Sequence, residues 1–212
     1  MITLKKATAE AVRYACLKYH YSRCVPSSSY SYNVYNEQNE WCGVILFGNG
    51  ATPHIATPFG LAQGEVLELV RVALNGKQPC TSECVGAALR RLHADAPQVK
   101  IVVSYADADQ NHLGIIYQAT NWVYLGLNGA GDRSAFIING KKVHPRTIGS
   151  SGGVQSLQWV REHLDKNATE FRTKGKNKYI YVFNKRLRKK WQAKAKPYPK
   201  GVDAILQSMN NG

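Results

Sequence analysis

The sequence predicts an α/β protein in which a mixed central sheet is flanked by helices. Short apolar runs rich in β-branched residues mark buried strands at 66–74 and 99–103, and segments with helical periodicity follow them at 82–93 and 112–121. Strands that alternate with helices indicate a mainly parallel or mixed sheet. A chain of 212 residues buries about 70% of its unfolded surface, so we expect a full hydrophobic core.

The N-terminal segment predicts a strand, a helix and a hairpin. Residues 2–7 are predicted to form the strand, and Thr8 is a fair N-cap for a helix that ends at about Tyr19. Residues 27–35 alternate small polar with aromatic side chains, which is typical of a strand. They are predicted to pair with residues 41–47 as a hairpin.

A loop rich in glycine, alanine and proline follows at 48–64, and it either lies over another part of the chain or forms a lid. The next strand, 66–74, is almost continuously apolar, which suggests burial on both faces. Its two exceptions are Glu68 and Arg71.

The middle of the chain predicts a β-α-β-α-β run. After the strand at 66–74, Ser82 is predicted to cap a helix that extends to His93. The polar segment after the next strand leads into a helix from His112 to Asn121, and a strand at 122–127 completes the run.

The C-terminal part begins with a predicted hairpin at 134–144, because Asn139–Gly140 is a strong signal for a tight turn. An amphipathic helix follows, with one apolar side made of Val154, Leu157, Val160 and Leu164. The remaining elements are a basic loop at 172–178, a closing strand at 179–183 and a basic helix from 185. We expect one catalytic domain over 1–184, whose part 133–184 is basic, and a basic, mobile tail at 185–212.

The net charge of +14 lies entirely in the C-terminal part of the chain. Residues 1–132 carry 10 Lys and Arg against 10 Asp and Glu, whereas residues 133–212 carry 18 against 4. A basic surface this concentrated attracts polyanions, and nucleic acid is the commonest of these. The alternative is a solvated lysine tail that only aids solubility.

Composition also predicts a soluble, intracellular protein. No apolar run approaches the roughly 20 residues of a membrane helix, so no membrane partner is expected, and the N-terminus lacks the apolar centre of a signal peptide. The five cysteines are odd in number and lack CxxC spacing, so we expect reduced thiols. Cys80 and Cys84 stand one helical turn apart at a helix start, where a thiolate would be stabilised, although buried packing is the alternative.

Polar side chains crowd where the strand at 99–103 ends, and ligands of open α/β sheets bind beyond the carboxyl ends of strands. The crowded residues are Ser104, Tyr105, Asp107, Asp109, Gln110, Asn111 and His112. Asp107 could accept a proton from a substrate amine, or it could cap the next helix. Tyr117 could donate a proton to a leaving group, or it could be a core aromatic.

Two further residues are candidates outside this cluster. Arg71 stands alone in an apolar strand and needs an anionic partner if it is buried, either Glu68, a neighbouring carboxylate or a ligand. His20 could be a base, a contact to a base edge or a metal ligand, although a lone histidine is often none of these. We predict no metal site, and His20 with Asp107 is the only pair worth testing.

The order of these elements resembles the GNAT acyltransferase fold. In that family the donor's pyrophosphate rests on backbone N–H groups at the start of a helix, and a tyrosine on the following helix serves as general acid, the place of Tyr117. Here the pyrophosphate loop would be residues 76–86, which contain a proline and few glycines. This departure argues against coenzyme A bound in the family's usual way.

A more specific resemblance is to the Mom family of phage DNA-modification proteins, which convert adenine in DNA to N6-carbamoylmethyladenine and so block restriction. It covers most of residues 19–184. The motifs that carry it are Tyr19-His-Tyr-Ser-Arg23, Trp41 to Gly50, Glu68-Leu-Val-Arg-Val-Ala73, Ser104-Tyr-Ala-Asp107, the run from His112 to Trp122, and Phe136 to Arg146.

The resemblance implies a transferase that acts on double-stranded DNA in the host cytoplasm. We assign catalysis to Asp107, Tyr117 and His20, and donor binding to Arg71, Ser82 and Ser104. For DNA contact the candidates are Tyr19, Tyr32, Tyr35, Lys141, Lys142, Arg146, Lys174 and Lys176. Tyr30, Tyr32 and Tyr35 could stack on a flipped adenine or be ordinary strand aromatics.

The carbamoylmethyl group has the atoms of glycinamide, so the implied donor is an activated glycine, with glycyl-tRNA as its cellular source. Acetyl-coenzyme A fits less well. Two rival functions remain open. A conventional coenzyme A-dependent N-acyltransferase would explain the fold, and a non-catalytic nucleic-acid-binding protein would explain the charge.

Overall fold

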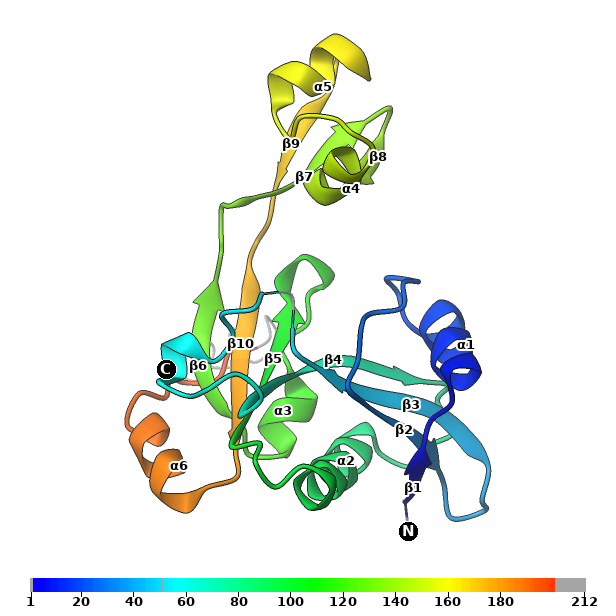
Figure 1. Cartoon of the computed structure of the whole chain (residues 1–212), viewed down its shortest axis with the longest axis vertical. Helices are drawn as coiled ribbons and strands as arrows, with labels where there is room; N and C mark the ends of the chain where they lie inside the picture. Colours follow the sequence, from blue (N-terminus) through cyan, green and yellow to red (C-terminus); the bar gives the residue numbers. More distant parts are fainter. Residues whose placement is uncertain (1, 51, 201–212) are drawn as a thin grey trace, which may run out of the picture. The chain divides into compact units, whose positions relative to one another are not determined.

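The computed structural model describes residues 2–50 and 52–200 (Figure 1). The chain forms two compact units. Unit 1 holds the described residues of Met1–Tyr105, Gly114–Gly126 and Lys178–Gly212, and unit 2 consists of Ala106–Leu113 and Leu127–Asn177. This division differs from the expected single domain over 1–184, because residues 127–177 fold around a core of their own.

A seven-stranded sheet forms the centre of unit 1, in the order β1-β2-β3-β4-β5-β10-β6. Its strands are β1 (Thr3–Lys6), β2 (Tyr30–Tyr35), β3 (Trp41–Gly48), β4 (Val66–Leu74), β5 (Ile101–Asp107), β6 (Val123–Asn128) and β10 (Lys176–Val182). β1 to β4 pair antiparallel, whereas β4 and β5 pair in parallel. The predicted mixed sheet is therefore confirmed.

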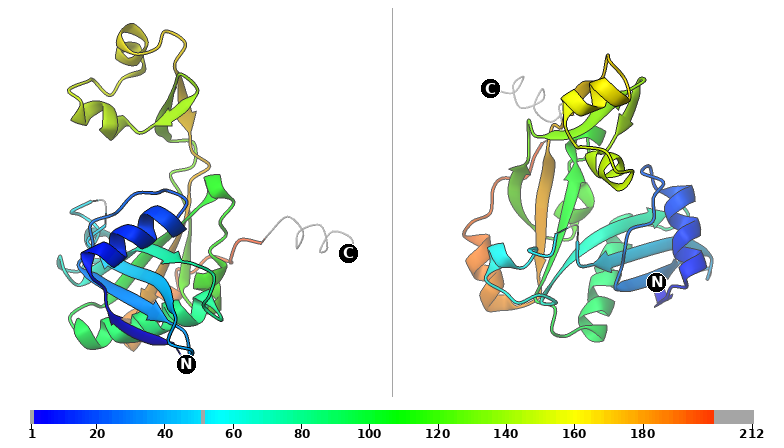
Figure 2. Two further views of the ribbon diagram at one scale, coloured as in Figure 1. Left: turned by 90° about the vertical axis from the view of Figure 1, so that its right-hand side faces the viewer. Right: turned by 45° about the horizontal axis from the view of Figure 1, so that its top comes forward.

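Helix α1 (Ala9–Tyr19) begins where the sequence predicts, because the Thr8 hydroxyl accepts a hydrogen bond from the Ala11 amide at 3.3 Å. The helix crosses β3 (Figure 2), and its residues Ala15 and Cys16 are fully buried against Val44 and Leu46. These contacts place α1 over the face of the sheet to which Val44 and Leu46 point.

A β-bulge in β4 decides where its two charged residues point. Leu46 of β3 faces Arg71, Gly48 faces Glu68, and Val70 is the extra residue between them. Residues that face each other across a ladder point to the same side. Glu68 and Arg71 therefore both lie on the face covered by α1, although an unbulged strand would send them to opposite faces.

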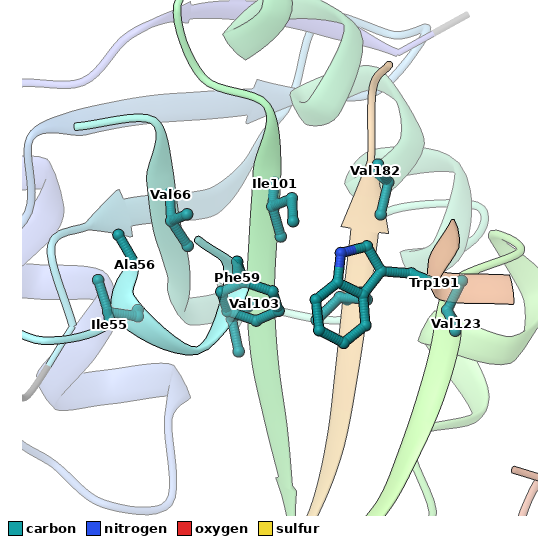
Figure 3. Packing of buried hydrophobic residues seen from close by; sticks show 10 residues of the cluster. Ile55, Ala56, Phe59, Val66, Ile101, Val103, Val123, Val182 and Trp191 are labelled. Atoms are coloured by element: carbon teal, nitrogen blue, oxygen red, sulfur yellow. The ribbon is translucent and has the colours of Figure 1, made fainter. Parts of the chain in front are cut away.

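Helix α6 (Lys185–Gln192) covers the other end of the same face. Val66 stands two residues before Glu68 and faces Ile101, so both point to the same side as Glu68. They belong to a core cluster with Phe59 and with Trp191 of α6. In Figure 3 the Trp191 indole reaches from α6 over β10 toward Phe59.

The opposite face of the sheet is covered by α2 (Thr81–Asp95) and α3 (Ile115–Ala119), which pack against each other. The N-cap of α2 is Cys80 and not the predicted Ser82, so the helix begins earlier than the sequence suggests. α3 is much shorter than the predicted 112–121, because Gly114 and Asn121 adopt left-handed conformations that a helix cannot contain.

The loop at 48–64 is packed against the core. It contains a short 3-10 helix, η1 (Thr57–Phe59), and buries Ile55, Ala56 and Phe59. The Phe59 ring meets Trp191 edge-on, with 5.0 Å between ring centroids. Of the two alternatives for this loop, these contacts match a segment that lies over the core.

The structure differs from the expected mobile tail over residues 185–200. Trp191 is only 8% exposed, the Lys196 amide donates to the Tyr124 carbonyl, and the Tyr198 hydroxyl donates to the Trp122 carbonyl. This segment thus lies along β6, which would otherwise be an open sheet edge. The rest of the predicted tail, 201–212, lies outside the described residues.

Unit 2 contains a three-stranded sheet in the order β8-β7-β9 and two short helices. The elements are β7 (Arg133–Ile138), β8 (Lys141–Val143), α4 (Pro145–Ser150), α5 (Leu157–His163) and β9 (Thr169–Arg172). The predicted Asn139–Gly140 turn is confirmed, with φ angles of 48° and 73°. Val154 and Leu164 were predicted on a buried helix side, but both are exposed and outside α5.

The core of unit 2 is small and consists of Phe136, Ile148, Val160 and Ala168. All five cysteines of the chain are free, as expected for reduced thiols. Among the residues that the structure describes, no helix combines the length and the apolar composition needed to cross a bilayer.

Candidate active site

The candidate site in unit 1 lies where β4 and β5 separate. Their parallel pairing ends at Glu68 and Val103, yet β4 runs on to Leu74 and β5 to Asp107. Parting strands leave backbone groups without ladder partners, and side chains must then satisfy them. The Ser104 hydroxyl does this, since it donates to the Leu69 carbonyl at 3.2 Å.

Tyr117 enters this gap from α3. Its hydroxyl lies 2.9 Å from the Ser104 hydroxyl, and both side chains are buried. A carbonyl only accepts, whereas a hydroxyl both donates and accepts, so the pair can form a relay in which Tyr117 donates to Ser104 and Ser104 to Leu69. Burial raises the pKa of Tyr117, an effect that outweighs the lowering by Ser104. Tyr117 therefore holds its proton at neutral pH.

Arg71 contacts two side chains that follow α1. Its Nη1 lies 3.0 Å from Nδ1 and 3.1 Å from Nε2 of His20, and its Nη2 donates to the Cys24 sulfur at 3.4 Å. These partners of Arg71 are an imidazole and a thiol rather than Glu68 or a neighbouring carboxylate, and the third alternative, a ligand, stays a prediction. Its Nε is buried without a hydrogen-bond partner among the described residues. This cation is incompletely satisfied within the protein, which favours an anionic ligand.

Glu68 adds a negative charge to the same gap. Its charge contributes to the raised pKa values of Tyr105 and Tyr117. Its carboxylate also lies against Gly50, where an added Cβ would come within 2.7 Å of Oε2. The sequence indicated Glu68 only as a partner of Arg71, and it did not single out Cys24 at all. The signal for Glu68 was its isolated charge in an apolar strand, whereas Cys24 left no such signal.

Aromatic rings enclose Tyr117 on its inner side. Trp122 and Tyr179 lie with ring centroids 5.0 and 5.1 Å from that of Tyr117, and Tyr124 lies 4.9 Å from Tyr179. Gly114 is required beside them, because a Cβ there would approach the Tyr179 ring to 2.5 Å. The ring of Tyr117 is thus held in place, as a proton donor must be. The core-aromatic alternative is therefore observed for the ring of Tyr117, and the role of its hydroxyl as a proton donor stays a prediction.

We expect the free energy of unfolding to fall as the pH rises from about 10 to about 12. Burial raises the pKa of Tyr117, Tyr124 and Tyr179, to about 12 for Tyr179, so these phenols stay neutral in the folded protein after they ionise in the unfolded chain. Their contribution is complete below the unfolded pKa and is lost as the pH rises through the folded one. Between its unfolded and its folded pKa, each of these phenols lowers the free energy of unfolding by up to about 1.4 kcal/mol per pH unit. Urea titrations should show a shallower fall for Tyr179→Phe, whereas the exposed Tyr14→Phe should behave like the wild type; equal slopes for all three proteins would contradict this.

Asp107 belongs to unit 2, and its observed contact is structural. Its Oδ1 accepts a hydrogen bond from the Asp109 amide at 3.0 Å and so caps η2 (Ala108–Gln110). Asp109 in turn accepts from the Thr173 hydroxyl and the Lys174 amide, at 2.9 and 2.8 Å. Asp107 is therefore a cap, as in the alternative, but it caps η2 and not the helix predicted from His112; its catalytic role stays a prediction.

The donor-binding candidate Ser82 lies at the N-terminus of α2. Its hydroxyl lies 2.9 Å from the sulfur of Cys80, and this hydrogen bond is the largest influence that lowers the Cys80 pKa. Burial raises the pKa of Cys84 to about 12, so of this pair only Cys80 has thiolate character. Ser82 and the gap residues Arg71 and Ser104 are all in unit 1. The role of Ser82 in donor binding stays a prediction.

The predicted DNA-stacking tyrosines have different environments. Tyr32 is 3% exposed, and its hydroxyl donates to Asp95 at 2.9 Å, so its prediction as a DNA contact is wrong: it packs between the sheet and α2. Tyr35 is half-buried beneath Lys5, whose Nζ lies 5.0 Å from the ring centroid. Tyr19 is half-buried beside Trp41, with 5.9 Å between ring centroids.

The predicted DNA-binding cations all lie in unit 2 and are exposed; they are Lys141, Lys142, Arg146, Lys174 and Lys176. Lys142 has partners within the unit, since its Nζ lies 3.5 Å from the Phe171 ring centroid and 3.7 Å from Asp109 Oδ2. The described residues contain no group of three or more His, Cys, Asp or Glu side chains that could hold a metal ion. His20 and Asp107, the one pair considered for a metal, fall in different units.

Comparison with known proteins decides the family. A family model described as the Mom protein family matches residues 1–200. The chain belongs to the Mom protein family. A relative from Escherichia phage Mu, named methylcarbamoylase mom, is 27% identical over 189 residues, which cover 85% of this chain and 76% of the relative. The family predicted from the sequence is confirmed, and with it the prediction that this Mom protein is an enzyme of the transferase class.

A solved structure confirms the predicted fold of this Mom protein. A protein described as a phosphinothricin N-acetyltransferase is 11% identical, with a TM-score of 0.50, and the match covers 87% of this chain and 100% of that one. The spermidine/spermine N-acetyltransferase SpeG from Vibrio cholerae is 10% identical, with a TM-score of 0.48, and the match covers 89% and 99%. At such identities the first match shows the GNAT fold alone.

Proposed function

We propose that this Mom protein modifies adenine in phage DNA by transferring a glycyl group to the exocyclic N6 amine, which a rearrangement then converts to a carbamoylmethyl group. The observation that carries the proposal is the Tyr117 hydroxyl, buried and hydrogen-bonded to Ser104 in the gap between β4 and β5. A neutral phenol held there can protonate a leaving group. The chain's membership in the Mom family and its similarity to a relative named methylcarbamoylase mom support this reaction class.

In the first step the N6 amine attacks the carbonyl carbon of a glycyl ester. The C–O bond to the donor breaks, Tyr117 protonates the departing oxygen, and the amine loses a proton to a base. N6-glycyladenine results. As the phenolate of Tyr117 forms, the Ser104 hydroxyl can rotate and donate a hydrogen bond to it. A hydrogen bond to the charged form lowers a pKa, and Ser104 does lower the pKa of Tyr117.

In the second step the free amine of the glycyl group attacks C6 of the purine. The bond from C6 to the original nitrogen breaks, and that nitrogen takes up a proton and becomes the carboxamide. The product is adenine with N6-CH2-CONH2, and no atom is gained or lost. The rearrangement predicts that the nitrogen finally attached to C6 comes from glycine.

Arg71 suits the donor's anionic group, because its guanidinium is incompletely satisfied within the protein. His20, in contact with Arg71, is the proposed proton acceptor for the adenine amine. An adenine in duplex DNA must be flipped out of the stack to reach such a site. Such an enzyme would work in the cytoplasm of the infected host, where both DNA and glycyl-tRNA are present.

Coenzyme A as donor is the second candidate, and the GNAT fold favours it. The start of α2, where that fold would hold a pyrophosphate, carries Pro79 and Cys80 in place of closely spaced glycines. A proline offers no N–H group to a phosphate. This local chemistry supports a glycyl donor over acetyl-coenzyme A.

Mass spectrometry of nucleosides from plasmid DNA of expressing cells tests the proposal. Growth on 15N-glycine should give a deoxyadenosine heavier by a carbamoylmethyl group, with the label on the nitrogen attached to C6. An acetylated deoxyadenosine would support coenzyme A in its place. Unmodified DNA from cells with soluble protein would exclude both reactions.

A further inference from the structure

The largest unbalanced charge of the chain lies in unit 1, in and after α6. Residues 178–200 contain nine Lys and Arg and no Asp or Glu. None of the nine forms an ion pair with a carboxylate within 2–50 and 52–200. Three cations of unit 2 do form such pairs, since Arg133 and Arg172 pair with Glu170, and Lys142 with Asp109.

Four basic side chains of α6 face solvent. We call Lys185, Arg186, Lys189 and Lys190 the α6 basic surface; all four are exposed. The opposite side of the helix is apolar, with Trp191 buried and Leu187 packed against the same core cluster. The helix therefore presents its cations from a fixed backbone.

Hydrogen bonds hold α6 at its N-terminus and just beyond its C-terminus. The Asn184 side chain caps it by accepting from the Leu187 amide at 2.9 Å. After the helix, the Lys196 amide donates to the Tyr124 carbonyl at 2.9 Å, and the Lys196 stem lies over Gly126. A surface ordered in advance loses less entropy when it binds a ligand.

This arrangement costs folding stability. Lys185 and Lys189, and Arg186 and Lys190, are like charges one turn apart, and each such pair destabilises the helix. Lys185 and Arg186 also occupy the first turn, where the helix dipole disfavours positive charge, whereas Lys189 and Lys190 occupy the last turn, where the dipole favours it. Repulsion between like charges that no ion pair relieves opposes stability, and such local conflicts are expected at functional sites.

The α6 basic surface belongs to the same unit as the candidate active site and to a helix on the same face of its sheet. α6 and α1 both cover the face to which Glu68 and Arg71 point, as the registers of β3, β4 and β5 establish. A polyanion held on α6 would thus lie on the face to which Glu68 and Arg71 point, whereas Tyr117 approaches the gap between β4 and β5 from α3 on the opposite face.

We infer that the α6 basic surface binds the phosphate backbone of a nucleic acid and holds it for the reaction in unit 1. The inference rests on the proposed function, since it names the surface that receives a substrate of that reaction. The shared chemistry is a chain of phosphates, supplied either by the duplex that carries the adenine or by the tRNA that carries the glycyl group. Lysine and arginine side chains that neutralise phosphates release counterions, so their number sets the salt dependence of binding.

The test compares the full chain with two fourfold variants. The first replaces Lys185, Arg186, Lys189 and Lys190 by glutamine. The second, a matched control, replaces Lys6, Arg13, Lys18 and Arg90, four exposed cations of β1, α1 and α2, by glutamine. Each protein is titrated with a 20-base-pair DNA duplex and, separately, with a deacylated tRNA, at several salt concentrations.

The α6 variant should bind at least one of the two probes about tenfold or more weakly than the control variant. The slope of log K against log salt should also become shallower by about 0.9 for each duplex phosphate that the variant no longer neutralises. Weaker binding of the duplex alone identifies the target DNA as occupant, and weaker binding of tRNA alone identifies the donor. If both variants bind both probes with equal affinity and slope, the inference is wrong.

Two controls separate this inference from the proposed function. Circular dichroism should show the α6 variant folded and no less stable than the wild type, because like charges have been removed. Binding is measured without turnover, so the two proposals fail independently. If the DNA is unmodified but the α6 variant binds nucleic acid more weakly, only the proposed reaction is wrong. If the DNA is modified but the α6 variant binds as well as the control variant, only the proposed role of the α6 basic surface is wrong.

Discussion

Tyr117→Phe should lower the rate of DNA modification by about 100-fold to 10,000-fold, the range expected when a general acid is removed. The substitution deletes one oxygen and leaves the ring in contact with Trp122 and Tyr179. Ser104 keeps its bond to the Leu69 carbonyl, so no buried donor is left unpaired. The measurement is the fraction of modified deoxyadenosine in plasmid DNA over time, at equal levels of soluble protein.

Tyr32→Phe is the matched control for this prediction. Tyr32 is also a buried tyrosine whose hydroxyl makes a 2.9 Å hydrogen bond, in its case to Asp95 on the opposite face of the sheet from Arg71. The substitution should cost about 1 kcal/mol of stability and leave the rate of modification unchanged. If Tyr117→Phe retained the activity of Tyr32→Phe, Tyr117 would have no chemical role.

Local chemistry explains which elements could be predicted from sequence. The Thr8 cap and the Asn139–Gly140 turn each depend on a few adjacent residues, and the structure has both. α3 was predicted too long because its apolar periodicity extends beyond the residues whose dihedral angles permit a helix, and Gly114 sets the start. β9 was missed because its four residues follow no clear alternation and are held by pairing with β7.

The candidate site was predicted only in part, because its key contacts join distant segments. Arg71 could be singled out as a charge in an apolar strand, but its contacts to His20 and Cys24 depend on where α1 ends over the sheet. The bond between Ser104 and Tyr117 requires the separation of β4 from β5, which no local pattern encodes. Likewise, Trp191 converts an expected tail into a packed helix through contacts with Phe59.

These contacts connect the β-bulge of β4 to function. Without Val70 as the extra residue, Glu68 and Arg71 would point to opposite faces, and Arg71 could not meet the residues that follow α1. The bulge thus brings the carboxylate of Glu68 and the guanidinium of Arg71 to the same side of the gap. The raised pKa of Tyr117 depends in part on the charge of Glu68, so the same bulge also helps to keep the phenol protonated.

Arg71→Gln should lower kcat/KM by about 10-fold to 150-fold, because a hydrogen bond to a charged group contributes about 1.5–3 kcal/mol. The effect should fall mainly on the KM for the donor if Arg71 binds the donor's anionic group, and the KM for DNA should stay nearly constant. Steady-state kinetics with each substrate varied in turn measures both quantities.

Arg71→Lys sharpens this prediction, because it keeps the charge and removes the planar fork that reaches both His20 and Cys24. The kcat/KM of Arg71→Lys should exceed that of Arg71→Gln by less than about tenfold. The control is Arg91→Gln, which removes an exposed arginine paired with Asp95 on α2 and should leave both KM values unchanged. A rise in the KM for DNA alone would reassign Arg71 from the donor to the acceptor side of the gap between β4 and β5.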